Sequence, residues 1–83
     1  MKTMEGTVLY VQESRFELQT PGGAGRLFVL SSRAAMEPQQ LQALQRTQAR
    51  IVVGYTEAEG VKVAVAHSVR AMADEVAAEA ERS

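Results

Sequence analysis

Apolar residues recur at every second position in several short runs of this chain, which is the period of a β-strand that buries one face. Residues 15–19 show the pattern most clearly, because Phe16 and Leu18 alternate with polar neighbours. Four further runs rich in β-branched, aromatic or other apolar residues are residues 3–12, 26–31, 49–56 and 61–67. These runs predict five strands and a mainly β fold.

The first run, residues 3–12, does not keep one period along its length. Gly6 and Val8 are two positions apart, but Val11 follows after three, so the three residues cannot share one face of a regular strand. A β-bulge, which inserts one extra residue, would bring them to the same side. We therefore predict that the first strand is bulged or coiled.

The segments between the strands predict turns and one short helix. Residues 20–25 contain a proline and three glycines, which suits a hairpin connection. Pro38 opens a glutamine-rich segment, and proline is favoured at the first position of a helix. The apolar side of the predicted helix, residues 38–47, consists chiefly of Leu41 and Leu44. So narrow a stripe is expected to cover one end of the sheet.

After the fifth run the chain becomes rich in alanine and acidic residues. Ser68 is an acceptable helix N-cap. Apolar residues then recur near helical spacing at Val69, Met72, Val76 and Ala80. We predict a barrel over residues 1–69 and a C-terminal helix in residues 70–83, which packs on the barrel or offers its apolar stripe to a partner.

The order of three strands, a helix and two strands resembles the OB fold. The segments that carry the resemblance are residues 6–11, the hairpin through Gly22 and Gly23, and the helix at Pro38. In OB domains this helix caps a five-stranded barrel, and closing a sheet removes its exposed edges. The resemblance implies a five-stranded antiparallel OB-like barrel, to which the C-terminal helix is added. An SH3-like barrel is the competing fold, and the interposed helix argues against it.

Short motifs are also similar to those of small bacterial proteins known only as hypothetical. The motifs are residues 6–8, 15–18, 28–30, 37–39 and 65–67. This similarity implies a bacterial protein and no particular activity.

The composition narrows the chemistry that the chain is expected to carry. The 83 residues include no cysteine and one histidine, which excludes disulfides and thiolate–zinc sites and leaves little for an imidazole-based metal site. His67 has no catalytic partner in the sequence pattern, and the chain lacks a nucleophile elbow or an acidic pair at a suitable spacing. We expect no enzyme, no cofactor and no catalytic or metal-binding residue.

The chain also lacks the patterns that direct a protein to a membrane. No apolar run approaches the roughly 18 residues of a membrane helix, and the first residues do not form a signal peptide. We expect a cytoplasmic protein with no membrane partner. The net charge of −1 gives no support of its own for binding a phosphate backbone.

OB domains that bind single strands stack bases on aromatic side chains of strands two and three and hold phosphates with lysine and arginine. Residues that are candidates for a nucleic-acid or partner surface are Arg15, Arg26, Phe28, Arg33, Arg50 and Lys62. Phe28 shares a face with Leu30, while Leu27 and Val29 take the other face, so the pattern leaves open which face is displayed.

Two binding functions follow from these observations. Near-neutral charge, few aromatic residues and an amphipathic tail favour a non-catalytic module that binds another protein or a second copy of itself. The alternative is binding of single-stranded DNA or RNA through the second and third strands.

Overall fold

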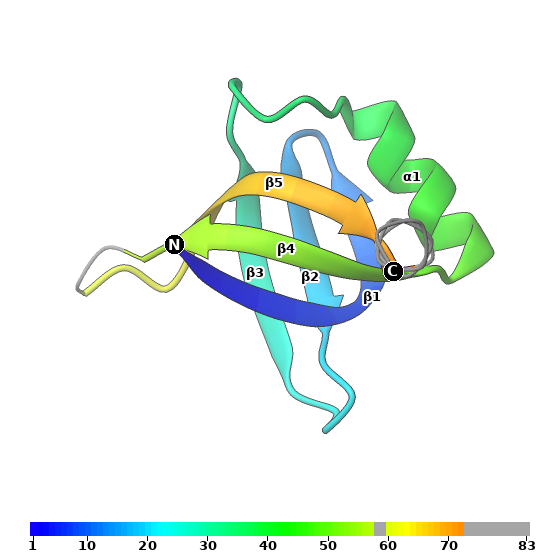
Figure 1. Cartoon of the computed structure of the whole chain (residues 1–83), viewed down its shortest axis with the longest axis horizontal. Coiled ribbons are helices and arrows are strands. Elements are labelled where there is room, and N and C mark those ends of the chain that lie inside the picture. The colour runs from blue at the N-terminus through cyan, green and yellow to red at the C-terminus, as the bar shows by residue number, and fades with distance from the viewer. Residues whose placement is uncertain (58–59, 73–83) are drawn as a thin grey trace, which may run out of the picture.

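The computed structural model describes residues 1–57 and 60–72, and these form a β-barrel with a helix at one end (Figure 1). The elements are β1 (Lys2–Gln12), β2 (Arg15–Gln19), β3 (Gly25–Leu30), α1 (Pro38–Thr47), β4 (Arg50–Thr56) and β5 (Ala64–Ala71). The barrel is closed, with the strand order β1-β2-β3-β5-β4. The predicted mainly β class and the helix between the third and fourth strands are confirmed.

The barrel wall contains one parallel seam, so the prediction of a fully antiparallel sheet is wrong at that place. Phe28–Leu30 of β3 pair in parallel with residues 64–66 of β5, whereas the other four pairs of neighbouring strands are antiparallel. A closed ring with an odd number of strands cannot alternate direction all the way round. Five strands therefore require at least one parallel pair.

A bulge in β1 confirms the prediction made from its irregular spacing. Val8 lies opposite Leu18 and Tyr10 lies opposite Glu17, which leaves Leu9 as the extra residue. Val8 is buried, whereas Leu9 and Tyr10 are each 42% exposed. The first half of β1 pairs with β4 and the second half with β2, so this one strand joins both parts of the barrel wall.

The core is apolar and is centred on three aromatic rings. Phe16 and Phe28 stack with their centroids 5.3 Å apart, and Tyr55 meets Phe28 edge-on at 5.2 Å. Such pairs stabilise a core beyond the area that they bury. The other buried core residues are Val8, Leu18, Leu30, Leu41, Ile51, Val53, Ala64 and Ala66.

Helix α1 covers the end of the barrel at which β3 ends and β4 begins (Figure 1). Pro38 lies in its first turn, and the Glu37 backbone N–H donates to Oε1 of Gln40 at 2.7 Å. Leu41 is fully buried in the core. Nε2 of Gln45 donates to the carbonyl oxygen of Leu9 at 2.9 Å, which links the helix to the β1 bulge.

Strand β5 differs from its prediction at both ends. It begins at Ala64, and Val61 remains 53% exposed in the segment before it. It continues to Ala71, and Val69 and Ala71 lie opposite Val53 and Ile51 of β4. The predicted helix of residues 70–83 is therefore wrong at Arg70 and Ala71, which belong to β5. The rest of the predicted helix, beyond Met72, lies outside the described residues.

The cause of this difference is a second bulge. Ala66 lies opposite Tyr55 and Ser68 lies opposite Gly54, so His67 is the extra residue. The bulge returns Val69 to the inner face, where it packs against the core. The change of pattern after residue 67, which suggested the end of the strand, is thus the position of a bulge within β5.

Candidate interaction surfaces

The predicted basic residues are not assembled on one side of the sheet. Arg15 is exposed and lies opposite Val29 on the outer face of the barrel. Arg26 lies opposite Leu18, which is fully buried, so Arg26 leaves β3 on the inner face. Residues directly opposite each other share a face of the sheet. Arg15 and Arg26 therefore do not form one phosphate track, contrary to the prediction.

Phe28 does not belong to a surface. Its side chain is fully buried between Phe16 and Tyr55, so of the two positions that the pattern left open the interior one is correct, and Phe28 is no longer a candidate for a binding face. The inner face of β3 is therefore the one that carries Phe28 and Leu30. Leu27 and Val29 lie on the outer face.

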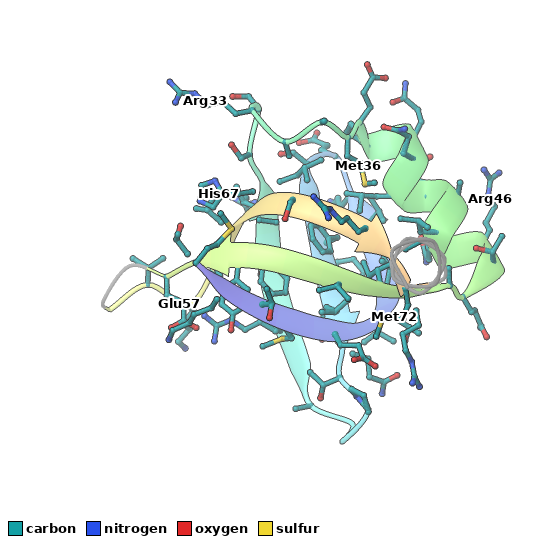
Figure 2. The ribbon with its side chains drawn as sticks, in the orientation of Figure 1. Arg33, Met36, Arg46, Glu57, His67 and Met72 are labelled. Carbon is teal, nitrogen blue, oxygen red and sulfur yellow. The ribbon has the colours of Figure 1, made fainter. Side chains whose placement is uncertain are left out.

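The other three predicted residues lie on three different segments. Arg33 is exposed in the loop between β3 and α1 and extends away from the barrel (Figure 2). Arg50 opens β4, and its Nη1 is 3.5 Å from Oε1 of Glu5. Lys62 is exposed in the connection between β4 and β5. The six predicted residues therefore do not make up one continuous site.

Leu27, Val29 and Val65 form an aliphatic strip on the outer face of β3 and β5. Val29 and Val65 are partners across the parallel seam, and Leu27 precedes Val29 by two positions on the same face. All three side chains are half-buried, yet none belongs to the set of apolar residues that packs on the core. We call these three residues the aliphatic strip.

Val29 and Val65 of the aliphatic strip belong to a row of residues that crosses the entire barrel wall. In the order of the strands around the barrel, the row consists of Gln12, Arg15, Val29, Val65 and Thr56. Its centre is aliphatic and its ends are polar or charged. Glu17 lies opposite Leu27 beside the row and adds a negative charge next to Arg15. An apolar centre with a polar rim is the usual composition of a protein-binding surface.

His67 belongs to the polar rim, and its side chain is hydrogen-bonded to Thr56. Its Nε2 lies 2.8 Å from Oγ1 of Thr56, at the end of the row, and the side chain is half-buried. This contact accounts for the lone histidine as a structural residue at a bulge. It also fixes the position of Thr56 beside Val65.

The aromatic side chains are almost all turned away from solvent. Phe16, Phe28 and Tyr55 are at most 6% exposed, and Tyr10 at the β1 bulge is 42% exposed. The outer faces of β2 and β3, which the structure describes completely, therefore present no aromatic ring. Stacking of bases, which provides much of the affinity for single strands, has no platform there.

A charged cluster lies at the other end of the barrel from α1, where β1 and β3 begin and β4 ends. Glu57 connects two cations, with Oε2 3.0 Å from Nζ of Lys2 and Oε1 2.9 Å from Nη2 of Arg26. The three residues line a cavity of about 670 Å³ together with Met1, Tyr55, Thr56, Gly60 and Val61. We call this region the barrel mouth.

Electrostatics in the barrel mouth favour the charged form of each group. The hydrogen bond from Lys2, with the positive charges of Lys2 and Arg26, holds the pKa of Glu57 below its ordinary value of 4.5. The same hydrogen bond and the charge of Glu57 raise the pKa of Lys2 above 10.5. Nε of Arg26 is buried and has no hydrogen-bond partner among the described residues.

Sequence reasoning identified parts of these surfaces and missed others. The displayed pair of Leu27 and Val29 was one of two alternatives for β3. Val65 was missed because its pairing with Val29 depends on the parallel seam. Glu57 and Lys2 are 55 positions apart, and no local pattern in the sequence connects them.

Within residues 1–57 and 60–72, no group of three histidine, cysteine or acidic side chains is arranged to hold a metal ion. No helix in the same part of the chain is long and apolar enough to cross a bilayer.

The comparisons with known proteins add no relative. No family model matches the chain, and neither the curated proteins nor the solved structures give a significant match.

Proposed function

We propose that this chain is a non-catalytic, OB-like module that binds another protein through the aliphatic strip. The observation that carries the proposal is the placement of Leu27, Val29 and Val65. These residues are contiguous on the outer face, half-buried, and separated from the core by the barrel wall. Single aliphatic residues are common on surfaces, whereas a contiguous group with a polar rim is typical of an interface.

Three features support the OB-like assignment. The strand order is β1-β2-β3-β5-β4 in a closed barrel, the helix between β3 and β4 covers one end, and the bulged β1 pairs with both β2 and β4. The outer face of the second and third strands is where OB domains bind their ligands. The aliphatic strip begins on the third strand, at the centre of that face.

The same face favours a protein over a nucleic acid. Arg15 and Glu17 have opposite charges and lie one row apart, so the rim does not attract a phosphate backbone strongly. The interior position of Phe16 and Phe28 leaves β2 and β3 without a ring on which bases would stack, and among the described residues only Tyr10, opposite Glu17 on β1, is an exposed ring beside this face. We propose a partner segment with apolar side chains for the aliphatic strip and with charges of both signs for Arg15 and Glu17.

The expected contribution of the aliphatic strip is moderate. Completing the burial of three partly exposed aliphatic side chains contributes on the order of 2 kcal/mol, or about thirtyfold in Kd. Val29→Glu should therefore abolish detectable binding, because it also places a charge at the centre of the interface. Val52 is a matched control, since it is also half-buried and outward-facing but lies on β4 opposite Glu5.

The test uses the full chain with a photoreactive benzoylphenylalanine in place of Gln12, at the exposed end of the row, expressed in cells of the source organism. The expected result is one discrete cross-linked protein that is lost in Val29→Glu and retained in Val52→Glu. Circular dichroism and thermal unfolding establish that both variants are folded. The captured protein is then purified, and its Kd is measured against the same variants.

Other outcomes contradict the proposal. A cross-linked species of twice the mass of the chain would identify a second copy as the partner. Fluorescence anisotropy with single-stranded DNA and RNA tests the alternative, and tight binding that falls steeply with salt would make the chain a nucleic-acid binder. Cross-links that are unaffected by Val29→Glu would exclude the aliphatic strip.

A further inference from the structure

The barrel mouth holds a charged residue on a face that otherwise forms the core. Arg26 projects from the inner side of β3, two positions before the buried Phe28. Tyr55, which packs on Phe28, lines the same cavity. The apolar core therefore ends in a cavity with an arginine at its wall. Mouths of β-barrels are common positions for small-molecule sites, and about 670 Å³ lies within their usual range of volumes.

The guanidinium of Arg26 is only partly used. Its Nη2 is paired with Glu57, while its Nε is buried and has no acceptor among the described residues. Nε–H and one Nη–H lie in the guanidinium plane and point in the same direction, and together they match the two oxygens of a carboxylate or phosphate. Glu57 uses one of these donors and gives its second oxygen to Lys2. The arginine edge is therefore incompletely satisfied.

Glu57 occupies the position that an external anion would take. Its carboxylate lies between the two cations, so the cluster of Lys2, Glu57 and Arg26 has one negative charge against two positive charges. Glu57 is the first residue after β4 and is not held in the sheet. Its side chain can rotate away without breaking a strand pair, and the two cations would then face the cavity.

We propose that the barrel mouth binds a small organic anion, whose carboxylate or phosphate group replaces the Glu57 carboxylate between Lys2 and Arg26. The anionic group takes both Nε–H and Nη2–H of Arg26 and the ammonium group of Lys2. The organic part lies against Tyr55 and Val61, which line the same cavity. Glu57 acts as an internal competitor for the site. The proposal is independent of the aliphatic strip, which lies on the outer face of the barrel wall.

Glu57 competes with the external anion for Lys2 and Arg26, so the charge of Glu57 weakens binding of the anion. Removing a residue of the site should strengthen binding, because Glu57→Gln frees both cations. We expect Glu57→Gln to bind the anion at least about tenfold more tightly than the unmodified chain, and Arg26→Met to lose binding. Glu5→Gln is the matched control, since it also removes one negative charge from an ion pair with an arginine but lies outside the barrel mouth.

The experiment is a titration of the full chain followed by ¹H–¹⁵N NMR at constant ionic strength. The probes are phenyl phosphate and benzoate, which share the organic ring and differ in the anionic group, and inorganic phosphate, which lacks the ring. The expected result is saturable shifts of Arg26 Nε–H and of the Gly60 and Val61 amides, with tighter binding in Glu57→Gln. The order of the affinities of the three probes identifies the preferred anionic group and the contribution of the ring.

Two results would overturn the proposal. The first is the absence of saturable shifts with every probe in both the unmodified chain and Glu57→Gln. The second is an equal gain in Glu57→Gln and Glu5→Gln, because this would reflect net charge alone. In either case the Lys2–Glu57–Arg26 cluster only closes the end of the barrel.

Discussion

Gly6 of β1 and Gln19 of β2 approach so closely that a methyl group on Gly6 would overlap the carbonyl oxygen of Gln19. The contact lies where β1 changes its partner, since Gly6 pairs with Ile51 of β4 and the next residue already pairs with Gln19. A glycine at this corner allows one strand to belong to both parts of the closed wall. The atom in the way is part of the backbone, so a side-chain rotation cannot relieve the overlap.

Gly6→Ala is therefore expected to destabilise the barrel. Forcing the two strands apart should lower the free energy of unfolding by about 1–3 kcal/mol, the usual cost of overpacking. Gly22→Ala is the control, because no atom lies within 4 Å of the added carbon and Gly22 does not have a positive φ. Urea denaturation of both variants measures the difference. Equal midpoints would show that the corner relaxes at no cost.

Phe28 provides a second prediction, because it is central to the aromatic cluster of the core. Phe28→Leu should lower the free energy of unfolding by roughly 1–3 kcal/mol, since it removes contacts with both Phe16 and Tyr55. Tyr10→Leu is the control at the exposed β1 bulge and should have little effect. Thermal unfolding followed by circular dichroism compares the stabilities of the two variants. A loss of partner binding with unchanged stability would contradict the core position of Phe28.

Local patterns of the sequence were sufficient to predict most of the fold. The alternation around Phe16 and Leu18 defined a half-buried strand, and the spacing of Gly6, Val8 and Val11 indicated the β1 bulge. Pro38 placed the start of the helix correctly. Each of these features depends on neighbouring residues alone, which is why a single sequence reveals them.

The errors concern features that depend on distant strands. Strand β5 continues past the bulge at His67 as far as Ala71, and only its pairing with β4 shows that these residues belong to a strand. The predicted grouping of basic residues on one interaction surface was wrong for the same reason. Arg26 and Arg15 both lie in the β2–β3 hairpin, but the register places them on opposite faces of the sheet. Charge and sequence proximity carry no information about which face a side chain takes at the end of a barrel.

Gln45 leads to a prediction about the attachment of α1. It is the residue of α1 whose side chain donates to the carbonyl oxygen of Leu9, at the point where the bulge disturbs the ladder of β1. Gln45→Ala should lower the free energy of unfolding by about 0.5–1.5 kcal/mol. Gln42→Ala is the matched control, because Gln42 lies on the exposed side of the same helix. Hydrogen exchange of the α1 amides should increase in Gln45→Ala and remain unchanged in Gln42→Ala.

The cluster of Lys2, Glu57 and Arg26 predicts a pH dependence of stability. Because the pKa of Glu57 is lowered in the folded chain, its ionised form stabilises the fold above about pH 4.5, and this contribution is lost as the pH falls through the lowered value. For Lys2 the pKa is raised, so its contribution is complete below pH 10.5 and is lost as the pH rises through the raised value.

Glu57→Gln should therefore be less stable than the unmodified chain between these limits and should approach it at lower pH, where a protonated Glu57 resembles glutamine. The exposed position of the ion pairs and their screening by salt keep the difference small. Urea denaturation across a pH series at low and high salt measures it, with Glu5→Gln as the control for net charge. A difference that persists unchanged below the lowered pKa would show that Glu57 acts through packing. A difference that disappears in acid and in high salt would show that its charge holds the end of β4 to β1 and β3.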